Sequence, residues 1–180
     1  MMKIANDYAY KITNDLDFAG YSWISRDFRG VINGQNHILK NLAIVVENQS
    51  ESKQTYGLFN YFRGTIHDLN IKDVYISVKT KGESTVGSIA GYMESGSIFN
   101  SSVSGIISNE KGEVGGFVGY SCPTITISNS YNSGSVSGQS NVGGFVGFSS
   151  STITISNSYN SGSVSGQSKH TSDFIVNAII

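Results

Sequence analysis

Short runs of alternating apolar and polar residues recur along the chain. Residues 124–127 read TITI, an alternation that places both isoleucines on one face of a β-strand. Residues 114–169 show no apolar residues sustained at the three-and-four spacing of a helix, and Gly, Ser and Asn are too frequent there to favour one. The pattern therefore predicts short strands joined by glycine-containing turns.

The strands belong to an internal repeat of about 28 residues. The stretch VGGFVG at residues 114–119 returns at residues 142–147, a step of 28 (142 − 114 = 28). The two units are identical at 24 of 28 positions (28 − 4 = 24), and they differ only at Tyr120/Phe148, Cys122/Ser150, Pro123/Ser151 and Asn141/Lys169. Weaker openings at Tyr56 and Val86 lie at steps of 30 and 28 before them. A fixed period of this length indicates a solenoid or repeat array.

These observations predict an all-β fold, a parallel β-helix or β-solenoid of about five coils. Paired coils lie about 4.8 Å apart, so five coils would rise about 24 Å. We assign residues 1–27 to an N-terminal cap, residues 28–169 to the repeat solenoid and residues 170–180 to a C-terminal strand or cap. Trp23 is interpreted as a packing anchor in the first cap, because the terminal units of a solenoid are atypical.

The repeated openings have predicted structural roles. The glycine pairs 115–116 and 143–144 can take positive φ, or can allow neighbouring backbones to approach where a side chain would clash. The apolar residues beside the first pair, Val114, Phe117 and Val118, are expected to fill the interior.

A second set of repeated residues consists of amides and one acid, each two places after an apolar residue. Its members are Asn41, Asp68, Asn100, Asn129 and Asn157. Stacked residues of this kind can exchange amide hydrogen bonds between coils. The alignment therefore predicts an asparagine ladder that is interrupted at Asp68.

The chain carries no pattern of catalytic or metal-binding residues. Its three histidines are His37, His67 and His170. The alignment puts His67 over Lys40. It puts His37 over Gly64, so neighbouring coils do not stack histidines into a metal site. Sugar-cleaving enzymes need two carboxylates flanking the scissile bond, whereas the acids here are scattered: Asp68, Asp73, Glu83, Glu94, Glu110 and Glu113. The glycine-rich openings also lack the Gly-Lys-Ser/Thr ending of a phosphate loop. We therefore expect no enzyme activity, no catalytic residues, no metal site and no cofactor.

Composition argues against several kinds of partner. A net charge of −1 with 12 Lys and Arg gives no basic footprint for nucleic acid or an anionic membrane. No run approaches the roughly 18 apolar residues that a membrane helix needs. Cys122 is the single cysteine, so an intrachain disulfide and a cysteine metal cluster are both impossible. Ser150 at the equivalent position indicates a small, tolerated side chain rather than a reactive thiol.

The two ends of the chain bear on location and assembly. The start, MMKIANDYAY, has one lysine and no apolar run, so it does not look like a signal peptide. Location stays open: we expect a cytoplasmic protein if Met1 is the native start, and a secreted or cell-surface one if the chain is a fragment of a longer adhesin. The apolar run at residues 173–180 could cap the last coil. An uncapped last coil would expose a strand edge and invite self-association.

What remains for function is the display of side chains. Three pairs recur one coil apart: Tyr131/Tyr159, Asn132/Asn160 and Ser133/Ser161. If they face outward, they form a flat polar strip that could bind a glycan or a protein. Alternatively, the tyrosines fill the core. Both interpretations stay open at this point, and the binding residues are unknown.

The repeat strongly resembles the GLUG motif, on the residues VGGFVGY at 114–120 and ISNSYNSGSVSG at 127–138. The lead-in ITNDLDFAGYSW at 12–23, followed by FRGVINGQNHI at 28–38, is similar to the segment that often precedes such repeats. The resemblance covers roughly residues 8–168. The family occurs in large bacterial surface proteins, including adhesins and the non-catalytic regions of secreted peptidases. It implies a β-helical stalk or binding surface and no catalytic residues, although this chain is short and shows no export signal.

Three functions are compatible with these observations. The leading hypothesis is a non-catalytic β-solenoid binding module of the bacterial adhesin type, which recognises a protein or glycan through its outer face. The second is a small intracellular inhibitor or decoy of the phage or mobile-element counter-defence type, which blocks a partner enzyme. A carbohydrate-active β-helix enzyme is the weakest of the three.

Overall fold

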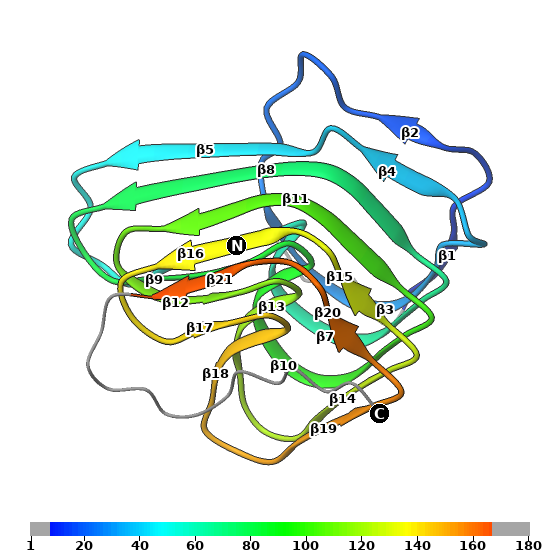
Figure 1. Cartoon of the computed structure of the whole chain (residues 1–180). Helices are drawn as coiled ribbons and strands as arrows, with labels where there is room; N and C mark the ends of the chain where they lie inside the picture. Colours follow the sequence, from blue (N-terminus) through cyan, green and yellow to red (C-terminus); the bar gives the residue numbers. More distant parts are fainter. Residues whose placement is uncertain (1–7, 167–180) are drawn as a thin grey trace.

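The computed structural model describes residues 8–166, and within them the chain forms 21 short strands and no helix. The strands wind in successive coils, and strands at the same place in each coil pair in parallel to make three sheets (Figure 1). The predicted all-β parallel solenoid is therefore confirmed. Within the described residues, no helix is long and apolar enough to cross a membrane.

Each sheet is a column of strands taken from successive coils. Sheet A consists of β1 (Tyr8–Lys11), β3 (Arg26–Asn33), β7 (Phe59–His67), β10 (Ala90–Phe99), β13 (Val118–Ser121), β14 (Ile125–Ser128), β18 (Val146–Ser149) and β19 (Ile153–Ser156). Sheet B consists of β2 (Leu16–Asp17), β4 (Ile38–Lys40), β5 (Ala43–Asn48), β8 (Asn70–Thr80), β11 (Ser102–Asn109), β15 (Tyr131–Asn132), β16 (Ser135–Gly138), β20 (Tyr159–Asn160) and β21 (Val164–Gly166). Sheet C consists of β6 (Gln54–Tyr56), β9 (Ser84–Gly87), β12 (Gly112–Gly115) and β17 (Val142–Gly143).

The strands group into five coils preceded by an incomplete turn. Coil 1 comprises β3–β5, coil 2 β6–β8, coil 3 β9–β11, coil 4 β12–β16 and coil 5 β17–β21. Residues 8–25, which contain β1 and β2, form what we call the lead turn. In sheet C, the four predicted openings lie in register: Tyr56, Val86, Val114 and Val142. The predicted repeat openings are thus confirmed. Parallel pairing requires this regularity, because it places equivalent residues of successive coils side by side.

The interior is a stack of apolar columns. One column in sheet A consists of Ile32, Ile66, Ile98, Ile127 and Ile155. Val114, Phe117 and Val118 are fully buried, as predicted. Phe117 packs against Phe145 of the next coil with ring centroids 5.1 Å apart. Burial of each such side chain contributes about 1.5–3 kcal/mol, so the columns hold the coils together.

The glycine pairs lie at sharp corners between sheets C and A, where backbones crowd together. A Cβ on Gly116 would overlap the carbonyl oxygen of Gly144 and lie 2.6 Å from Nδ2 of Asn132. None of the four glycines at 115, 116, 143 and 144 adopts positive φ. Of the two predicted explanations, close approach is therefore the one that applies.

Backbone conformation, rather than an amide ladder, explains the column of Asn and Asp. Four of its members share φ between 47° and 55°: Asp68, Asn100, Asn129 and Asn157. This is the left-handed region, which Asn and Asp tolerate better than other non-glycine residues. Asn100 Nδ2 donates to Asp68 Oδ1 over 3.1 Å. Among the described residues this is the one amide hydrogen bond within the column, so the predicted ladder is wrong. Its predicted interruption at Asp68 is also wrong, because Asp68 is the residue that accepts this bond.

The predicted alignment of coil 1 is also wrong. Ile32 of β3 lies beside Ile66, whereas Leu39 lies on β4 in sheet B. Gly34 follows Asn33 at the corner position that Asp68 occupies in coil 2. Glycine takes the place of the Asn or Asp residue that marks this corner in later coils. The marker that was missed is the triplet Phe-Arg-Gly, which occurs at 28–30 and at 62–64 and pairs residue by residue between the two coils.

Asn41 belongs to a second left-handed corner. It lies next to Asp73, just after the last residues at which β4 pairs with β8, and the two residues have φ of 59° and 56°. Asn41 Nδ2 donates to Asp17 Oδ1 over 2.7 Å. This bond ties the lead turn to coil 1 and, together with the backbone N–H of Ala19, lowers the pKa of Asp17.

The lead turn continues the sheets over part of coil 1. β1 pairs with β3 and β2 pairs with β4. Trp23 is partly buried against the core and stands edge-on to Phe18 at 5.4 Å. Its Nε1 donates to the carbonyl of Leu58 over 2.9 Å, which agrees with its predicted role as a packing anchor. The predicted C-terminal strand or cap at 170–180 lies outside the described residues.

Candidate binding surface

The outer face of sheet B in coils 4 and 5 displays two matching rows of hydroxyl groups. Alternate residues from 131 to 137 point outward, and those from 159 to 165 repeat them in the next coil. We call this surface the hydroxyl strip, and its members are Tyr131, Ser133, Ser135, Ser137, Tyr159, Ser161, Ser163 and Ser165. The intervening residues face the interior, because side-chain direction alternates along a strand.

Tyr131 and Tyr159 form the aromatic end of the hydroxyl strip. Their rings stack with centroids 5.4 Å apart and planes within 7° of parallel. The two residues are 41% and 47% exposed, so the structure decides between the two predicted placements in favour of the surface. Beside them, Ser163 Oγ donates to Ser135 Oγ over 2.7 Å, which links the two rows.

Asn132 and Asn160 do not belong to the hydroxyl strip, contrary to the hypothesis that all three repeated pairs share an outward face. Asn132 is fully buried. Its Nδ2 donates to the carbonyl of Gly144 over 2.9 Å and to Asn160 Oδ1 over 2.8 Å. Its Oδ1 accepts from the N–H of Gly134 over 3.0 Å. Because the preceding tyrosine points outward, the asparagine must point inward, where it satisfies buried backbone groups.

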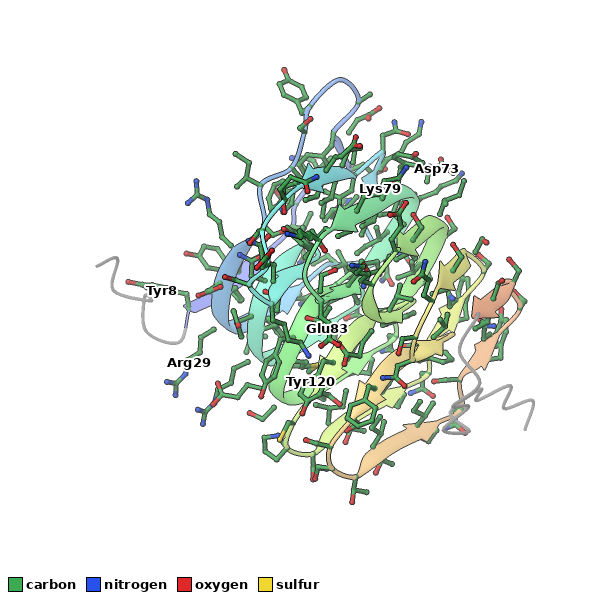
Figure 2. All side chains as sticks on the ribbon, turned by 90° about the vertical axis from the view of Figure 1, so that its left-hand side faces the viewer. Tyr8, Arg29, Asp73, Lys79, Glu83 and Tyr120 are labelled. Carbon is green, nitrogen blue, oxygen red and sulfur yellow. The ribbon has the colours of Figure 1, made fainter. Side chains whose placement is uncertain are left out.

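The hydroxyl strip is electrically neutral. Residues 114–168 contain no Asp, Glu, Lys or Arg, a run of 55 residues (168 − 114 + 1 = 55). A groove of about 360 Å³ extends the strip into coils 2 and 3 along four serines in register: Ser77, Ser108, Ser137 and Ser165. Lys79, labelled in Figure 2, borders this groove and forms an ion pair with Glu110 at 3.5 Å. Within the described residues, charged side chains therefore occur on this face of the solenoid only in the coils that precede coil 4.

His67 pairs with an acid rather than with another histidine. Its Nδ1 lies 2.6 Å from Asp68 Oδ2, and its ring stacks on Phe99 at 5.0 Å. The hydrogen bond with His67 holds the pKa of Asp68 below its ordinary value. In the sheet, His67 lies between Asn33 and Phe99. The predicted position over Lys40 is wrong because coil 1 was misaligned, and Asn33 is the residue beside His67. Neither neighbour of His67 in the sheet is a histidine.

His37 pairs with an acid of the lead turn. Its Nδ1 lies 3.0 Å from Asp15 Oδ1. The backbone N–H of residue 38 also donates to this carboxylate, and it is the main cause of a lowered pKa for Asp15, ahead of the His37 hydrogen bond. The carbonyl of His37 accepts from the N–H of Asn70, so the predicted position over Gly64 is wrong as well.

The described residues bring no set of metal ligands together. Within residues 8–166, no three His, Cys, Asp or Glu side chains are grouped so that they could hold a metal ion. His170 lies outside this range. Three of the scattered acids pair with Lys or Arg: Glu110 with Lys79 at 3.5 Å, Glu94 with Arg63 at 3.4 Å and Glu113 with Lys53 at 3.3 Å. These contacts give the acids a structural explanation.

Sequence analysis missed an aromatic column on sheet A. It consists of Tyr61, Tyr92, Tyr120 and Phe148, with successive ring centroids 5.3, 5.3 and 5.6 Å apart. Burial raises the pKa of Tyr92, whose hydroxyl donates to the carbonyl of Cys122 over 3.1 Å. The signal was an aromatic residue six places after the openings at 86, 114 and 142. Figure 2 labels Tyr120 on this side of the molecule.

Comparison with known proteins identifies a GLUG motif in the chain. Residues 138–165, which span the end of coil 4 and most of coil 5, match the family model described as the GLUG motif. No curated protein sequence matches the chain. Among solved structures, the crystal structure of a provisionally named immunoglobulin A1 protease from Bacteroides ovatus is similar with a TM-score of 0.47 and 18% identity, and the match covers 89% of this chain and 71% of that one.

Proposed function

We propose that this chain is a non-catalytic binding module that recognises a neutral glycan through the hydroxyl strip. The observation that carries the proposal is the strip itself, eight hydroxyl side chains in two matching rows (4 + 4 = 8) within a run of 55 uncharged residues. A hydroxyl group both donates and accepts hydrogen bonds. Such a surface complements a ligand that also presents hydroxyl groups and carries no charge.

The rigidity of the hydroxyl strip favours binding. Every member lies on or between strands that are paired with a neighbouring coil, so little backbone freedom is lost when a ligand binds. Tyr131 and Tyr159 add large contact areas with few rotatable bonds. A surface that repeats every coil, at about 4.8 Å, suits a ligand that repeats too, and we therefore favour a polysaccharide over a single sugar.

The GLUG motif at 138–165 overlaps the hydroxyl strip. The resemblance noted above, to repeats found in bacterial adhesins, supports a role in attachment. A carbohydrate-active enzyme would need a pair of carboxylates at the sugar. The absence of any acid from residues 114–168 leaves the strip without that pair, which supports binding without cleavage.

The test is binding of the full chain to a panel of neutral and acidic polysaccharides. We expect saturable binding to a neutral member, and at least about tenfold weaker binding when Tyr131→Ala and Tyr159→Ala are combined, equivalent to about 1.4 kcal/mol. Tyr75→Ala is the matched control, because Tyr75 is 48% exposed on the same sheet but lies outside the strip. Equal losses in both variants, binding only to charged glycans, or release of reducing ends would contradict the proposal.

A further inference from the structure

A cleft of about 580 Å³ opens at the N-terminal end of the solenoid, where the lead turn covers only part of coil 1. β2 pairs with β4, and Ser22 then bridges to Ala43. From there the chain crosses through residues 23–25 to β3, and Figure 1 shows no strand over β5. The cleft is lined by residues 22–25 on one side and by residues 44–46 and 53–56 on the other.

Backbone groups of β5 point into this opening. β5 pairs with β8 alone. Consecutive residues of a parallel strand direct their N–H and C=O groups to opposite sides. The carbonyl of Leu42 accepts from Tyr75 of β8, while the carbonyl of Ala43 accepts from the N–H of Trp23 in the lead turn. Two and four residues further along, the backbone groups at positions 45 and 47 point the same way as those of Ala43, toward the side where no described strand lies.

The edge of β6 faces the same opening. β6 pairs with β9 alone, and the N–H of Gln54 donates to the carbonyl of Glu83 on that side. Thr55 therefore directs its backbone groups toward the cleft. The backbone groups of Gly57 point the same way. The Ser25 hydroxyl of the lead turn donates to the C=O of Gly57 and accepts from its N–H. The lead turn thus replaces a strand at Gly57 and leaves Thr55 open.

Apolar side chains surround these open edges. Ile24 is 72% exposed and Val45 is 65% exposed, and both line the cleft. On the interior side, Trp23, Ile44 and Val46 also line it. Exposed apolar residues beside an unpaired strand edge are the features of a surface that accepts an added strand.

One charged column defines what an added strand would carry. Glu47 is in register with Lys79, and Lys79 is ion-paired with Glu110 of the next coil at 3.5 Å. The column therefore alternates acid, base, acid, and it ends at Glu47 on the open edge. Opposite charges placed across paired strands are favourable, so the next strand should present a basic residue over Glu47.

We propose that this end of the solenoid binds an extended segment of another protein, which adds to β5 as a parallel strand. The segment carries alternate apolar residues that face Ile44 and Val46, and a Lys or Arg over Glu47. This site lies at the opposite end of the solenoid from the hydroxyl strip and does not rest on glycan binding. Binding by strand addition relies on main-chain hydrogen bonds for affinity and on alternate side chains for selection.

The chain itself supplies a probe. A capped synthetic peptide of residues 74–80, VYISVKT, has apolar residues at the inward positions and Lys79 at the position that pairs with Glu47. We expect saturable binding to the full chain with a dissociation constant below about 1 mM. At nine-tenths saturation, the backbone amides of Val45 and Glu47 should exchange with solvent about tenfold more slowly in NMR spectra.

Backbone methylation of the probe distinguishes strand addition from apolar adsorption. In β8, the backbone groups of Tyr75 face β5, so those of Ile76 and Val78 face the following coil. A peptide of this sequence added over β5 in the same register would bond to β5 through its backbone groups at positions 76 and 78. Methylation of the amides at 76 and 78 should abolish binding, and methylation at 77 and 79 should preserve it. Equal binding of the two methylated peptides would overturn the proposal.

Variants of the protein complete the test. Val45→Pro removes an N–H that points away from β8, so the fold should survive, as proline is accepted on edge strands. We expect at least a tenfold loss of peptide binding, with Val45→Thr as the control that keeps the N–H. Glu47→Lys should weaken binding, and a peptide with Lys79→Glu should restore it. The proposal would be overturned if the peptide did not bind, or if the charge exchange did not restore binding. It would also be overturned if Val45→Pro changed the protein from dimer to monomer in the absence of peptide, because a second copy would then occupy the edge.

Discussion

The two nearly identical repeats offer the same substitution in two environments, at Asn132 and Asn160. Asn132→Ala removes two good donor contacts and one acceptor contact in a fully buried site. At about 1 kcal/mol for each hydrogen bond, the loss should be about 3 kcal/mol, and the unsatisfied N–H and C=O left behind can only increase it. Asn132 is therefore expected to be one of the most sensitive polar residues in the chain.

Asn160→Ala provides the matched control. It removes the shared bond to Asn132 and a bond from its Nδ2 to the carbonyl of Gly162 at 2.9 Å. Asn160 is only partly buried, so water replaces part of what is lost and the expected cost is about 1 kcal/mol. Because the two substitutions are chemically identical and lie in equivalent strands, differences in strand propensity cancel.

The assay is urea unfolding of both variants and the parent, monitored by far-ultraviolet circular dichroism. The free energies are compared with the same slope of free energy against urea concentration for all three proteins. The expected difference between the variants is about 2 kcal/mol in the free energy of unfolding. Equal losses would show that burial does not set the value of this amide. A loss below about 0.5 kcal/mol for Asn132→Ala, the range of ordinary surface substitutions, would refute the reasoning altogether.

Two further predictions concern backbone and charge. Gly64 has φ of +138° and a Cβ there would overlap the carbonyl of Gly30, so Gly64→Ala should lower the free energy of unfolding by at least about 3 kcal/mol. Gly20 has φ of +81° but no atom within 4 Å of a Cβ, so Gly20→Ala should lower it by about 1 kcal/mol. Thermal unfolding of both variants checks this. The pKa of Asp68 is lowered in the folded chain, so its contribution to stability is complete above the unfolded value of about 3.9 and is lost as pH falls through the folded pKa. Thermal midpoints measured from about pH 6 to about pH 2 should decline less steeply in Asp68→Asn, and an unchanged slope would contradict the assignment.

Much of the architecture could be read directly from the chain. The openings at 56, 86, 114 and 142 lie in register, because a parallel solenoid can repeat in sequence only if it repeats in space. The apolar residues of those openings form the core for the same reason. Coil 1 was misaligned because the alignment followed the Asn and Asp corner residues, and Gly34 stands where later coils carry them. The triplet Phe-Arg-Gly at 28–30 and 62–64 would have given the correct register.

The candidate surfaces were harder to predict. In the segment from 131 to 137, every residue but Val136 is Tyr, Asn, Ser or Gly, so polarity alone does not show which alternate set points outward. The unpaired edge of β5 could not be predicted from composition either. It exists because the lead turn leaves the column after Ser22, a choice that depends on Trp23 and Ser25 bonding to residues 32–35 places away along the chain.

The sequence by itself determined the all-β class, the repeat length, the interior valines and phenylalanines and the positions of the glycine corners, because these follow from periodicity and from the size of side chains. Only the tertiary structure decided the phase of the strand at Tyr131, the inward amide of Asn132 and the unpaired edge above Val45. Each of these depends on which residue of a neighbouring coil lies alongside, and stacking between coils is a long-range relation that local alternation cannot specify.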